Sequence, residues 1–472
     1  MSQYRPLSAV VLAAGEGTRM RSETPKVLHP LCGRPMLLHV IDALVALPLE
    51  RIVVVVGHGA ERVTKTLQEQ LATELPVEFV EQRVQRGTGD AASVALTAGV
   101  FDLDAEDDLL VVPGDAPLLR AETLATLARA HREADAAATV LTAILRPPTG
   151  YGRVVRDENG AVDHIVEDAD AAPDELEIDE INTSIYCFRR GLLAPALRRL
   201  SPENAQGEYY LTDAVSVLKE TGHGVIAVVA EDPYETAGVN DREQLADVEA
   251  ALRRRINRRW MRDGVSMTDP ERTYVDATVE LEPDVQLLPG TILSGRTVVG
   301  ARSVIGPDTQ LTDTIVGEGA TVRQTVADEA EIGDDATVGP FVFLRPGARL
   351  AARAHVGTFV EIKNSDIGVG AKVPHLAYIG DAEIGDGANI GAGTITANYD
   401  GREKHRTKVG KNARISSNTV LVAPVEVGDE AYTGAGAVVT QDVPPRAMAK
   451  GVPAQITEGW LDEREAERDE RG

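Results

Sequence analysis

The stretch 281-LEPDVQLLPGTILSGRTVVGARSVIGPDTQL-311 places an apolar residue at every sixth position. These residues are Leu281, Leu287, Leu293, Val299, Ile305 and Leu311. An α-helix buries a residue about every 3.6 positions and a half-buried strand every second one, so a period of six fits neither. The period is typical of a parallel β-helix, in which hexads form flat faces and three hexads complete one coil.

The six-residue pattern slips after Leu311 and then resumes further along the chain. It continues at Val338, Leu344, Leu350, Val356, Ile362, Ile367, Val373, Ile379, Ile384 and Ile390, and then at Val409, Ile415, Leu421, Val427, Thr433 and Val439. The segment 396-TANYDGREKHRTK-408 is too long and too polar for one hexad, so we expect it to loop out of the coil. The charged end, 458-EGWLDEREAERDERG-472, is predicted to be frayed or disordered.

The first half of the chain alternates between strand-like and helix-like segments. Short apolar runs predict strands in AVVLAAG (9–15), RIVVVVGH (51–58), VEFVEQ (77–82) and DLLVVPGD (108–115). Such runs with helices between them indicate a Rossmann-like α/β domain, whose mostly parallel sheet is covered on both faces. Ligands of such sheets bind beyond the C-terminal ends of the strands. A helix predicted over 243–263 links this domain, 1–242, to the repeat region, 264–472.

The composition limits the classes of function. Among 472 residues, 74 acidic side chains face 48 basic ones, a formal net charge of -26. Such a surface repels nucleic acid and anionic lipid, so neither is expected as a partner. Two cysteines, Cys32 and Cys187, are too few for a disulfide framework and lack zinc spacing, which favours a reducing compartment. No signal-peptide layout or membrane-length apolar run is present, so a cytoplasmic protein is expected.

A glycine-rich turn, 10-VVLAAGEGTRM-20, follows the first predicted strand. It lacks the third glycine of a dinucleotide fingerprint, because Met20 stands there, and it lacks a Walker A lysine. Free N–H groups near Gly15 and Gly17 and the charge of Arg19 suit an anion. Lys26, in 23-ETPKVL-28, follows a proline and could return to the same phosphates. On these residues alone, a structural turn and a surface lysine stay open as alternatives.

The motifs LAAGEGTRM and PKVL together resemble the signature of sugar-nucleotide pyrophosphorylases. The segments GTGDA, PGDAPLL, PTGYGRVV, IVED, EINTSIY, NAQGEYYLTD and GVND then follow in the order of one branch of that family. Together with the hexads, the chain from about Val10 to Val443 is similar to the family of bifunctional N-acetylglucosamine-1-phosphate uridylyltransferases/glucosamine-1-phosphate acetyltransferases. The resemblance implies a uridylyltransferase domain at 1–242 and a left-handed parallel β-helix acetyltransferase domain at 264–472.

For the first domain, the resemblance implies attack of a sugar 1-phosphate oxygen on the α-phosphorus of UTP, with release of pyrophosphate and with Mg²⁺ as cofactor. It assigns the metal to Asp115 and Asn240, and catalytic roles to Lys26 and Arg19. It assigns the nucleotide and sugar to Leu12, Ala13, Ala14, Gly15, Lys26, Gln82, Gly87, Thr88, Gly152, Glu167, Asn182 and Asn240. Of these, Gln82, Gly87 and Thr88 read uracil, and Gly152, Glu167 and Asn182 hold the sugar. Taken singly, Asp115 could be a turn residue and Asn240 a helix cap. Pro113 departs from the tyrosine that the family often has there.

For the repeat domain, acetyl transfer from acetyl-CoA needs a base, and histidine is the usual one near neutral pH. The resemblance assigns this role to His375 in 372-KVPHLAYIGD-381, although a histidine at a coil corner could be structural. It assigns the sugar phosphate to Arg345, Lys363, Tyr378 and Asn389, and acetyl-CoA to Ala392, Asn398, Tyr399, Ser417 and Ala435. The segment 447-AMAKGVPAQ-455 departs from the family's basic C-terminal pattern, so no role is assigned to Lys450.

The resemblance further implies a homotrimer whose product, UDP-N-acetylglucosamine, is a precursor of bacterial peptidoglycan and lipopolysaccharide. Exposed aliphatic faces of a flat-sided prism would gain by being buried between copies. One alternative is a monofunctional pyrophosphorylase with a structural or regulatory β-helix, and a more distant one is a non-catalytic scaffold. The grouping of His375, Arg345 and Lys363 with the Asn398 loop favours two activities, because a purely structural helix does not need these residues.

Overall fold

The structure, a computed structural model, describes residues 5–101, 106–451 and 454–469. It forms two compact units, Met1–Arg253 and Arg254–Gly472. The helix predicted over 243–263 is present as α7, Arg242–Arg262, and the boundary between the units falls within it. The division of the chain into domains at 242 and 264 stays a prediction.

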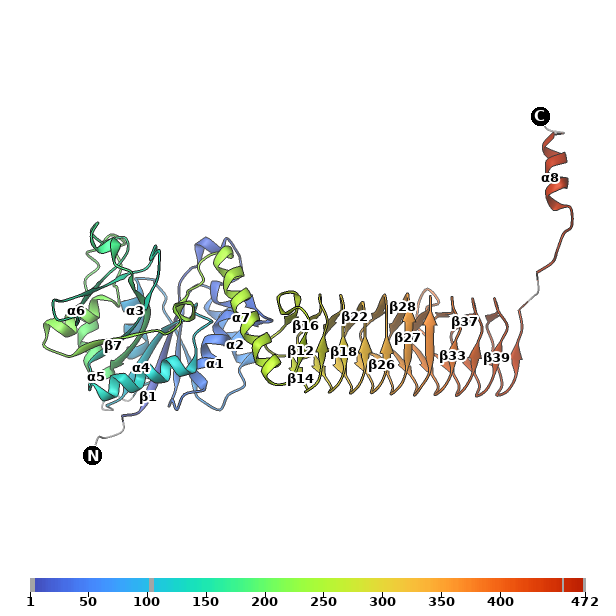
Figure 1. Ribbon diagram of the computed structural model, residues 1–472, viewed down its shortest axis with the longest axis horizontal. Helices are drawn as coiled ribbons and strands as arrows, with labels where there is room; N and C mark the ends of the chain where they lie inside the picture. The colour runs from blue at the N-terminus through green and yellow to red at the C-terminus, as the bar shows by residue number, and fades with distance from the viewer. Residues whose placement is uncertain (1–4, 102–105, 452–453, 470–472) are drawn as a thin grey trace. The chain divides into compact units, whose positions relative to one another are not determined.

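The first unit is built on a mixed, mostly parallel sheet (Figure 1). Its strands follow the order β11-β7-β10-β6-β1-β4-β5, and the hairpin of β8 and β9 extends from β10. The strands are β1 (Leu7–Ala13), β4 (Ile52–Val56), β5 (Val77–Glu81), β6 (Asp108–Pro113), β7 (Ala138–Ile144), β8 (Arg153–Arg156), β9 (Val162–Val166), β10 (Glu180–Arg189) and β11 (Val225–Val229). The four strands predicted from the sequence are β1, β4, β5 and β6, which lie side by side and parallel. Strand β10 runs antiparallel to both of its neighbours, β6 and β7.

Helices cover both faces of this sheet, as predicted. They are α1 (Met36–Val45), α2 (Ala60–Gln70), α3 (Thr88–Thr97), α4 (Ala121–Glu133), α5 (Arg190–Leu197) and α6 (Asp213–Glu220). Side chains of β1 alternate between the two cores: Ala9 and Val11 join a cluster with α1, α2 and α4, and Val10 joins a cluster with α3, α5 and α6. Burial on both faces explains the continuous apolar runs of these strands.

The second unit is a parallel β-helix made of three stacked sheets (Figure 1), which we call faces 1, 2 and 3. Face 1 contains β12 (Ser266–Met267), β15 (Gln286–Leu287), β18 (Val304–Ile305), β21 (Thr321–Val322), β24 (Thr337–Val338), β27 (His355–Thr358), β30 (Lys372–His375), β33 (Asn389–Ile390), β36 (Arg414–Ile415), β39 (Tyr432–Thr433) and β41 (Met448–Ala449). Face 2 contains β13 (Tyr274–Val275), β16 (Ile292–Ser294), β19 (Gln310–Thr312), β22 (Thr325–Asp328), β25 (Val342–Leu344), β28 (Val360–Lys363), β31 (Tyr378–Gly380), β34 (Ile395–Ala397), β37 (Val420–Val422) and β40 (Val438–Val439). Face 3 contains β14 (Glu280–Leu281), β17 (Val298–Val299), β20 (Ile315–Val316), β23 (Glu331–Ile332), β26 (Ala348–Leu350), β29 (Ser365–Ile367), β32 (Ala382–Ile384), β35 (Thr407–Val409) and β38 (Val425–Val427).

The apolar hexad residues form the buried interior of this β-helix, which confirms the prediction. Leu287 stacks on Ile305 along face 1, and Leu293 stacks on Leu311 along face 2. All four side chains are completely buried. Val316 follows Leu311 after only five residues and is also buried, because Asp313 turns the corner in the left-handed region with φ 46°. The slip in the sequence pattern is therefore a shorter corner in an uninterrupted interior.

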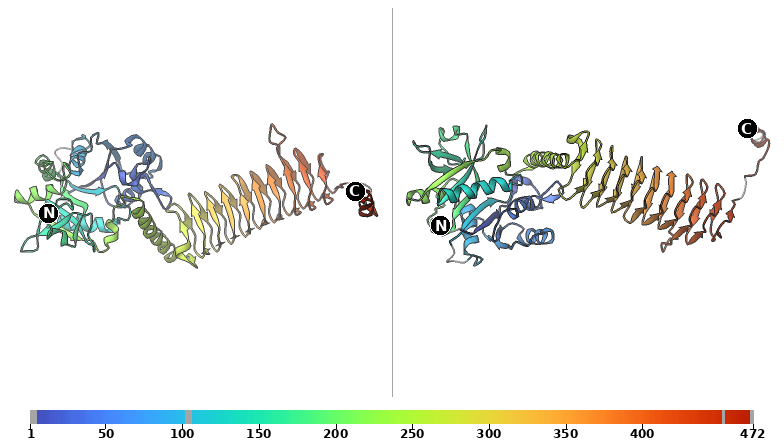
Figure 2. Two further views of the ribbon diagram at one scale, coloured as in Figure 1. Left: turned by 90° about the horizontal axis from the view of Figure 1, so that it is seen from above. Right: turned by 60° about the horizontal axis from the view of Figure 1, so that its bottom comes forward.

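Two predictions for irregular segments have different outcomes. The polar insertion lies between β34 and β35 and projects from the coil (Figure 2, left), as predicted. The prediction of a frayed or disordered end is wrong for its described part, which forms α8, Trp460–Asp469. The N–H of Glu463 donates to Gly459 O at 2.9 Å, and the Arg464 guanidinium lies 4.8 Å from the centre of the Trp460 ring. The glutamate and arginine residues that suggested disorder are also good helix formers. Across the described ranges, no helix combines the length and apolar character that a bilayer crossing needs.

Candidate active sites

The glycine-rich turn of the first unit connects β1 to a short helical turn, η1 (Thr18–Met20). Gly17 adopts φ 64°, and a Cβ atom added there would lie 2.6 Å from the Cβ atom of Lys26. A Cβ atom at Gly15 would meet nothing within 4 Å, and Arg19 is exposed. The turn is therefore open on the side of Gly15 and Arg19, and it requires glycine at position 17 so that Lys26 can approach.

Lys26, Asp115 and Asn240 meet at the C-terminal ends of the parallel strands, although they come from distant parts of the chain. The Lys26 ammonium forms an ion pair with Asp115 and donates to Asn240 Oδ1 at 3.2 Å. Asp115 lies two residues after the end of strand β6, and its backbone oxygen accepts from Val239 N at 2.9 Å. This contact ties the Asn240 segment to the end of β6.

The donor set fits a divalent cation with hard ligands. Both Asp115 and Asn240 present oxygen atoms to one positive charge, that of Lys26. Among the described residues there is no cluster of three or more histidine, cysteine or acidic side chains that could enclose a metal alone. Magnesium is usually held by one or two carboxylates together with substrate phosphates, so two protein oxygens beside the glycine-rich turn suit it.

Gly17 and Gly15 form a matched pair for testing the phosphate loop. Gly17→Ala should raise the KM for UTP and lower the rate of pyrophosphate release by about tenfold or more, because the new Cβ atom displaces Lys26 and a left-handed alanine costs about 1–2 kcal/mol. Gly15→Ala should have a much smaller effect on folding, because its Cβ atom meets open space. Equal losses of thermal stability in the two variants would contradict this account. Thermal unfolding of the purified proteins makes the comparison, and steady-state kinetics measure the loss of activity in Gly17→Ala.

The three residues predicted to read uracil lie together at the start of α3. Gln82 directly follows β5, and its N–H donates to Val56 O at 2.8 Å. Gly87 adopts φ 106°, and a Cβ atom there would lie 2.6 Å from the backbone oxygen of Tyr209. The Thr88 hydroxyl accepts from Leu211 N at 3.0 Å. The segment 209–211 is thereby fixed against the first turn of α3.

The three residues predicted to hold the sugar also meet. Asn182 N donates to Gly152 O at 2.8 Å, and a Cβ atom at Gly152 would lie 3.3 Å from Glu167 Oε2. Glu167 accepts from the Thr212 hydroxyl at 3.0 Å. A cavity of about 160 Å³ is lined by Glu167 and Thr212 and also by two residues of the predicted nucleotide site, Leu12 and Thr88. The structure therefore brings one predicted sugar residue, Glu167, and two predicted nucleotide residues to one cavity.

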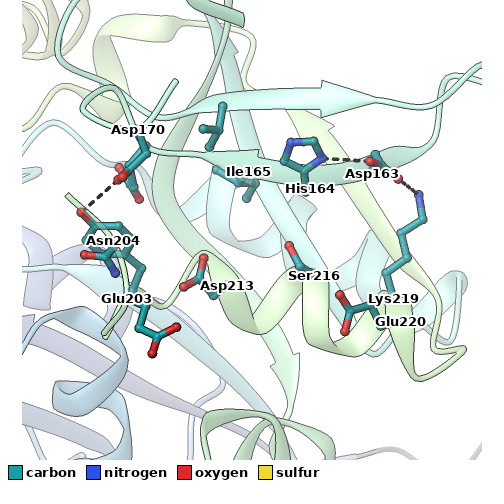
Figure 3. A pocket seen from close by; sticks show the side chains of 13 residues that line it. Asp163, His164, Ile165, Asp170, Glu203, Asn204, Asp213, Ser216, Lys219 and Glu220 are labelled. Atoms are coloured by element: carbon teal, nitrogen blue, oxygen red, sulfur yellow. Dashed lines mark hydrogen bonds and ion pairs between the residues drawn. The ribbon is translucent and has the colours of Figure 1, made fainter. Parts of the chain in front are cut away.

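A second cavity of about 660 Å³ shares Glu167 and Tyr210 with the first. Its lining is rich in carboxylates, including Asp163, Asp170 and Asp213 (Figure 3). Burial raises the pKa of Glu167, and the carboxylates of Asp213 and Asp170 raise it further. This acidic lining repels phosphate and suits hydroxyl and amide groups. This cavity was not predicted from the sequence, because its carboxylates are scattered from 163 to 220.

In the second unit, the predicted base and three predicted acetyl-CoA residues form one column. They lie two residues after the buried positions Val373, Ile390, Ile415 and Thr433, and they are His375, Ala392, Ser417 and Ala435. Asn418 N donates to Ala392 O at 2.7 Å, and Gly436 N donates to Ser417 O at 2.9 Å, so successive coils are in direct register. His375 is exposed at the end of β30. We call this set the corner column; it lies where face 1 turns into face 2.

The predicted sugar-phosphate cations lie at the next corner, where face 2 ends. Arg345 pairs with Glu361 at 2.9 Å, and Lys363 pairs with Asp381 at 3.3 Å. Lys404 of the projecting loop lies beside Lys363, whose ammonium lowers the pKa of Lys404. Lys404 was not assigned from the sequence, although its basic surroundings in the looped-out segment were a signal.

Asp381 organises this corner and was also not assigned from the sequence. It accepts from Asn398 Nδ2 at 2.5 Å, from Asn364 Nδ2 at 2.6 Å and from Lys363. Burial alone would raise the pKa of Asp381, but these three hydrogen bonds lower it overall. Asn398 is thereby held at the base of the projecting loop. The signal was present, because Asp381 ends the quoted motif KVPHLAYIGD.

The remaining predicted residues lie on two different faces. A Cβ atom at Gly380 would lie 2.5 Å from the Tyr378 hydroxyl and 2.8 Å from Asn398 Nδ2, so Tyr378 and Asn398 meet on face 2. Tyr399 is exposed in the projecting loop. Asn389 lies on face 1, in register with Lys372. A single chain therefore does not place Asn389 on the face that carries Tyr378.

Both halves of the chain match known families. Residues 9–212 match the model of the MobA-like NTP transferase domain, and residues 406–441 match the bacterial transferase hexapeptide (six repeats). The chain is 49% identical to "Bifunctional protein GlmU" of Brevibacillus brevis, over 95% of this chain and 96% of the relative. The chain belongs to the GlmU family. A protein of the same name from Kineococcus radiotolerans is 50% identical over 96% of this chain and 92% of the relative. Another from Streptomyces coelicolor is 50% identical over 98% of this chain and 95% of the relative.

Membership in the GlmU family confirms the resemblance inferred from the sequence. It also confirms the prediction that the chain is an enzyme with a nucleotidyltransferase half and a hexapeptide acetyltransferase half. The GlmU relatives are named bifunctional and match nearly the full length of the chain. This finding favours two activities over a monofunctional pyrophosphorylase with a structural β-helix. The roles of individual residues in GlmU function stay predictions for this chain.

Proposed function

We propose that the chain makes UDP-N-acetylglucosamine in two steps, each in one unit. The β-helix unit acetylates the amine of glucosamine 1-phosphate with acetyl-CoA. The first unit then transfers the uridylyl group of UTP to N-acetylglucosamine 1-phosphate and releases pyrophosphate. The observation that carries the proposal is the meeting of Lys26, Asp115 and Asn240 beside the glycine-rich turn. These are the groups that a nucleotidyl transfer requires, and membership in the GlmU family supports the acetylation step.

In the uridylyl step, the turn at 13–17 and Lys26 bind the phosphates of UTP, with Arg19 at the open side. Asp115 and Asn240 hold Mg²⁺, which when bound supplies neutralisation of the charge that develops on the departing pyrophosphate. The carboxylates around Glu167 exclude phosphate from the opposite end and favour the sugar hydroxyls. The substrates are thereby oriented with their phosphates toward Lys26 and the sugar toward Glu167.

In the acetyl step, the exposed His375 imidazole takes a proton from the attacking amine. Arg345, Lys363 and Lys404 supply positive charge for the sugar phosphate. Tyr378 and Asn398, which meet over Gly380, bind the sugar and the acetyl donor. The corner column from Ala392 to Ala435 extends away from His375 through successive coils, which suits a long, extended coenzyme.

We also propose a homotrimer assembled through face 2. Six exposed apolar side chains follow this face, and they are Tyr274, Ile292, Val326, Phe343, Ile395 and Val438. At the corner beside it, the exposed rings of Phe341 and Phe359 stack with centres 5.3 Å apart. Burial of such a strip between copies is favourable, and it would bring face 1 of one copy, with Asn389, to face 2 of another. Light scattering on the intact chain tests this, and the mass of a single chain would contradict it.

The proposed sequence of steps is tested with purified protein, Mg²⁺, glucosamine 1-phosphate, acetyl-CoA and UTP, with CoA and pyrophosphate measured together. We expect both products, with pyrophosphate dependent on acetyl-CoA. Chelation of the metal should stop pyrophosphate release and leave CoA release unchanged. If pyrophosphate forms only when N-acetylglucosamine 1-phosphate is supplied, and CoA does not appear, the β-helix has no acetyltransferase activity. A cytoplasmic location and a contribution to cell-wall precursors stay predictions.

A further inference from the structure

The side-chain amide of Gln82 has its nitrogen fully used inside the protein. Gln82 is buried, with 3% of its surface exposed, and Nε2 donates to Asp90 Oδ2 at 2.8 Å and to Gly87 O at 3.3 Å. An amide nitrogen carries only two hydrogens, so both are committed. The nitrogen end therefore has no donor left for a ligand.

Asp90 allows only one of the two flip orientations of the Gln82 side-chain amide. Its side chain lies in the first turn of α3, and Oδ1 accepts from Arg86 at 2.6 Å. The Arg86 guanidinium in turn lies 5.8 Å from the centre of the Tyr209 ring. A carboxylate can only accept hydrogen bonds, so it binds the NH₂ end of the amide and repels the oxygen end. A flipped Gln82 would place two oxygen atoms against each other in a buried position.

The side-chain oxygen of Gln82, Oε1, differs from the nitrogen in having no donor among the described residues. The atom is also absent from the fully buried side-chain atoms that lack a partner, so it keeps contact with solvent. Gln82 therefore presents only an acceptor to whatever binds beside it.

We propose that Asp90 is a specificity-determining positioning residue, which fixes the Gln82 amide so that the site accepts a pyrimidine with an N–H at ring position 3 and rejects one with a bare N3. Uracil and thymine carry this N–H, whereas N3 of cytosine is an acceptor and would face Oε1 without a hydrogen. The inference rests on the proposed uridylyl transfer and on Gln82 as the residue that reads the ring. A site that leaves a buried polar group unpaired with the wrong ligand rejects it by about 10- to 100-fold or more.

The test compares kcat/KM for UTP, CTP and N3-methyl-UTP, with N-acetylglucosamine 1-phosphate, Mg²⁺ and the full-length chain. The unmodified protein should prefer UTP strongly and should use N3-methyl-UTP poorly, because the methyl group removes the hydrogen that Oε1 accepts. In Asp90→Asn, the new amide can either donate or accept a hydrogen bond, so the Gln82 side-chain amide can flip. The ratio of kcat/KM for UTP to that for CTP should then fall by about tenfold or more.

Arg86→Gln provides the matched control, because it removes the outer partner of Asp90 and leaves the contact between Asp90 and Gln82. Its UTP/CTP ratio should stay within about twofold of that of the unmodified protein. If Asp90→Asn changes kcat/KM for UTP and CTP by the same factor, Asp90 is only structural and the inference is overturned.

The unmodified protein also tests the inference without any variant, which covers the case in which Asp90→Asn fails to fold. Equal use of N3-methyl-UTP and UTP would overturn the role of Oε1 while leaving uridylyl transfer intact. Release of no pyrophosphate from any nucleotide would overturn the proposed function itself, and the inference with it.

Discussion

Asp115→Ala is expected to reduce pyrophosphate release by about 10²- to 10³-fold and to leave CoA release from acetyl-CoA and glucosamine 1-phosphate unchanged. The carboxylate of Asp115 faces the Lys26 ammonium at the end of β6, where the phosphates of UTP are proposed to bind. Removing it deletes both the partner of Lys26 and one of two oxygens that fit the metal. The second unit contains none of these groups, so its activity should not change.

Two further variants separate charge from folding in this experiment. Asp115→Asn keeps an oxygen that can accept from Lys26 but loses the negative charge, so its activity should fall between those of Asp115→Ala and the unmodified protein. Asp42→Ala removes a carboxylate that pairs with Arg34 outside the site, and its activity should be normal. If Asp115→Ala lost both activities while its thermal unfolding stayed normal, the assignment of one activity to each unit would be wrong.

His375→Ala is expected to have the opposite effect, a loss of CoA release by about 10²- to 10⁴-fold with normal uridylyl transfer to supplied N-acetylglucosamine 1-phosphate. A general base must be unprotonated to accept a proton, so kcat/KM of the unmodified protein should fall toward acidic pH. In the variant, the residual rate should lose that acidic limb. This pH profile distinguishes a base from a residue that only shapes the corner.

His355 provides a control for His375, because it lies one coil away on the same face. Burial lowers the pKa of His355, and the charges of Lys372 and His375 lower it further. His355→Ala removes an imidazole at the start of the neighbouring strand β27, in register with Lys372, and it should keep the acidic limb and most of the rate. If the two variants lost activity equally and with the same pH profile, His375 would be a corner residue and the base would lie elsewhere.

Most of the fold could be predicted, because the pattern of apolar residues that determines it is local in the sequence. One apolar residue in six is enough to bury Leu287 on Ile305 and Leu293 on Leu311, and no distant information is needed. The same holds for β1, β4, β5 and β6, whose continuous apolar runs require burial on both faces. The antiparallel strand β10 could not be placed in this way, because its position between β6 and β7 depends on pairing with residues 36 to 81 positions away.

The candidate sites could be predicted in part. Lys26, Asp115 and Asn240 lie within family motifs, and the structure brings them together. The carboxylates that orient other side chains did not stand out, because Asp90 and Asp381 act through Gln82 and Asn398 and resemble any acidic residue in a sequence. Helix α8 was missed for a related reason, since composition alone does not distinguish a charged helix from a disordered tail.

The corner column has a consequence for how the β-helix can change. Strands of adjacent coils lie about 4.8 Å apart, so residues at equivalent positions mark regular intervals along one axis, starting at His375. A ligand that lies along this axis contacts the corner column at one position per coil. Loss or gain of a whole coil beyond Ala435 would shorten or lengthen the column without moving the residues nearer to His375. The length of ligand that the corner column contacts can therefore change independently of the chemistry at His375.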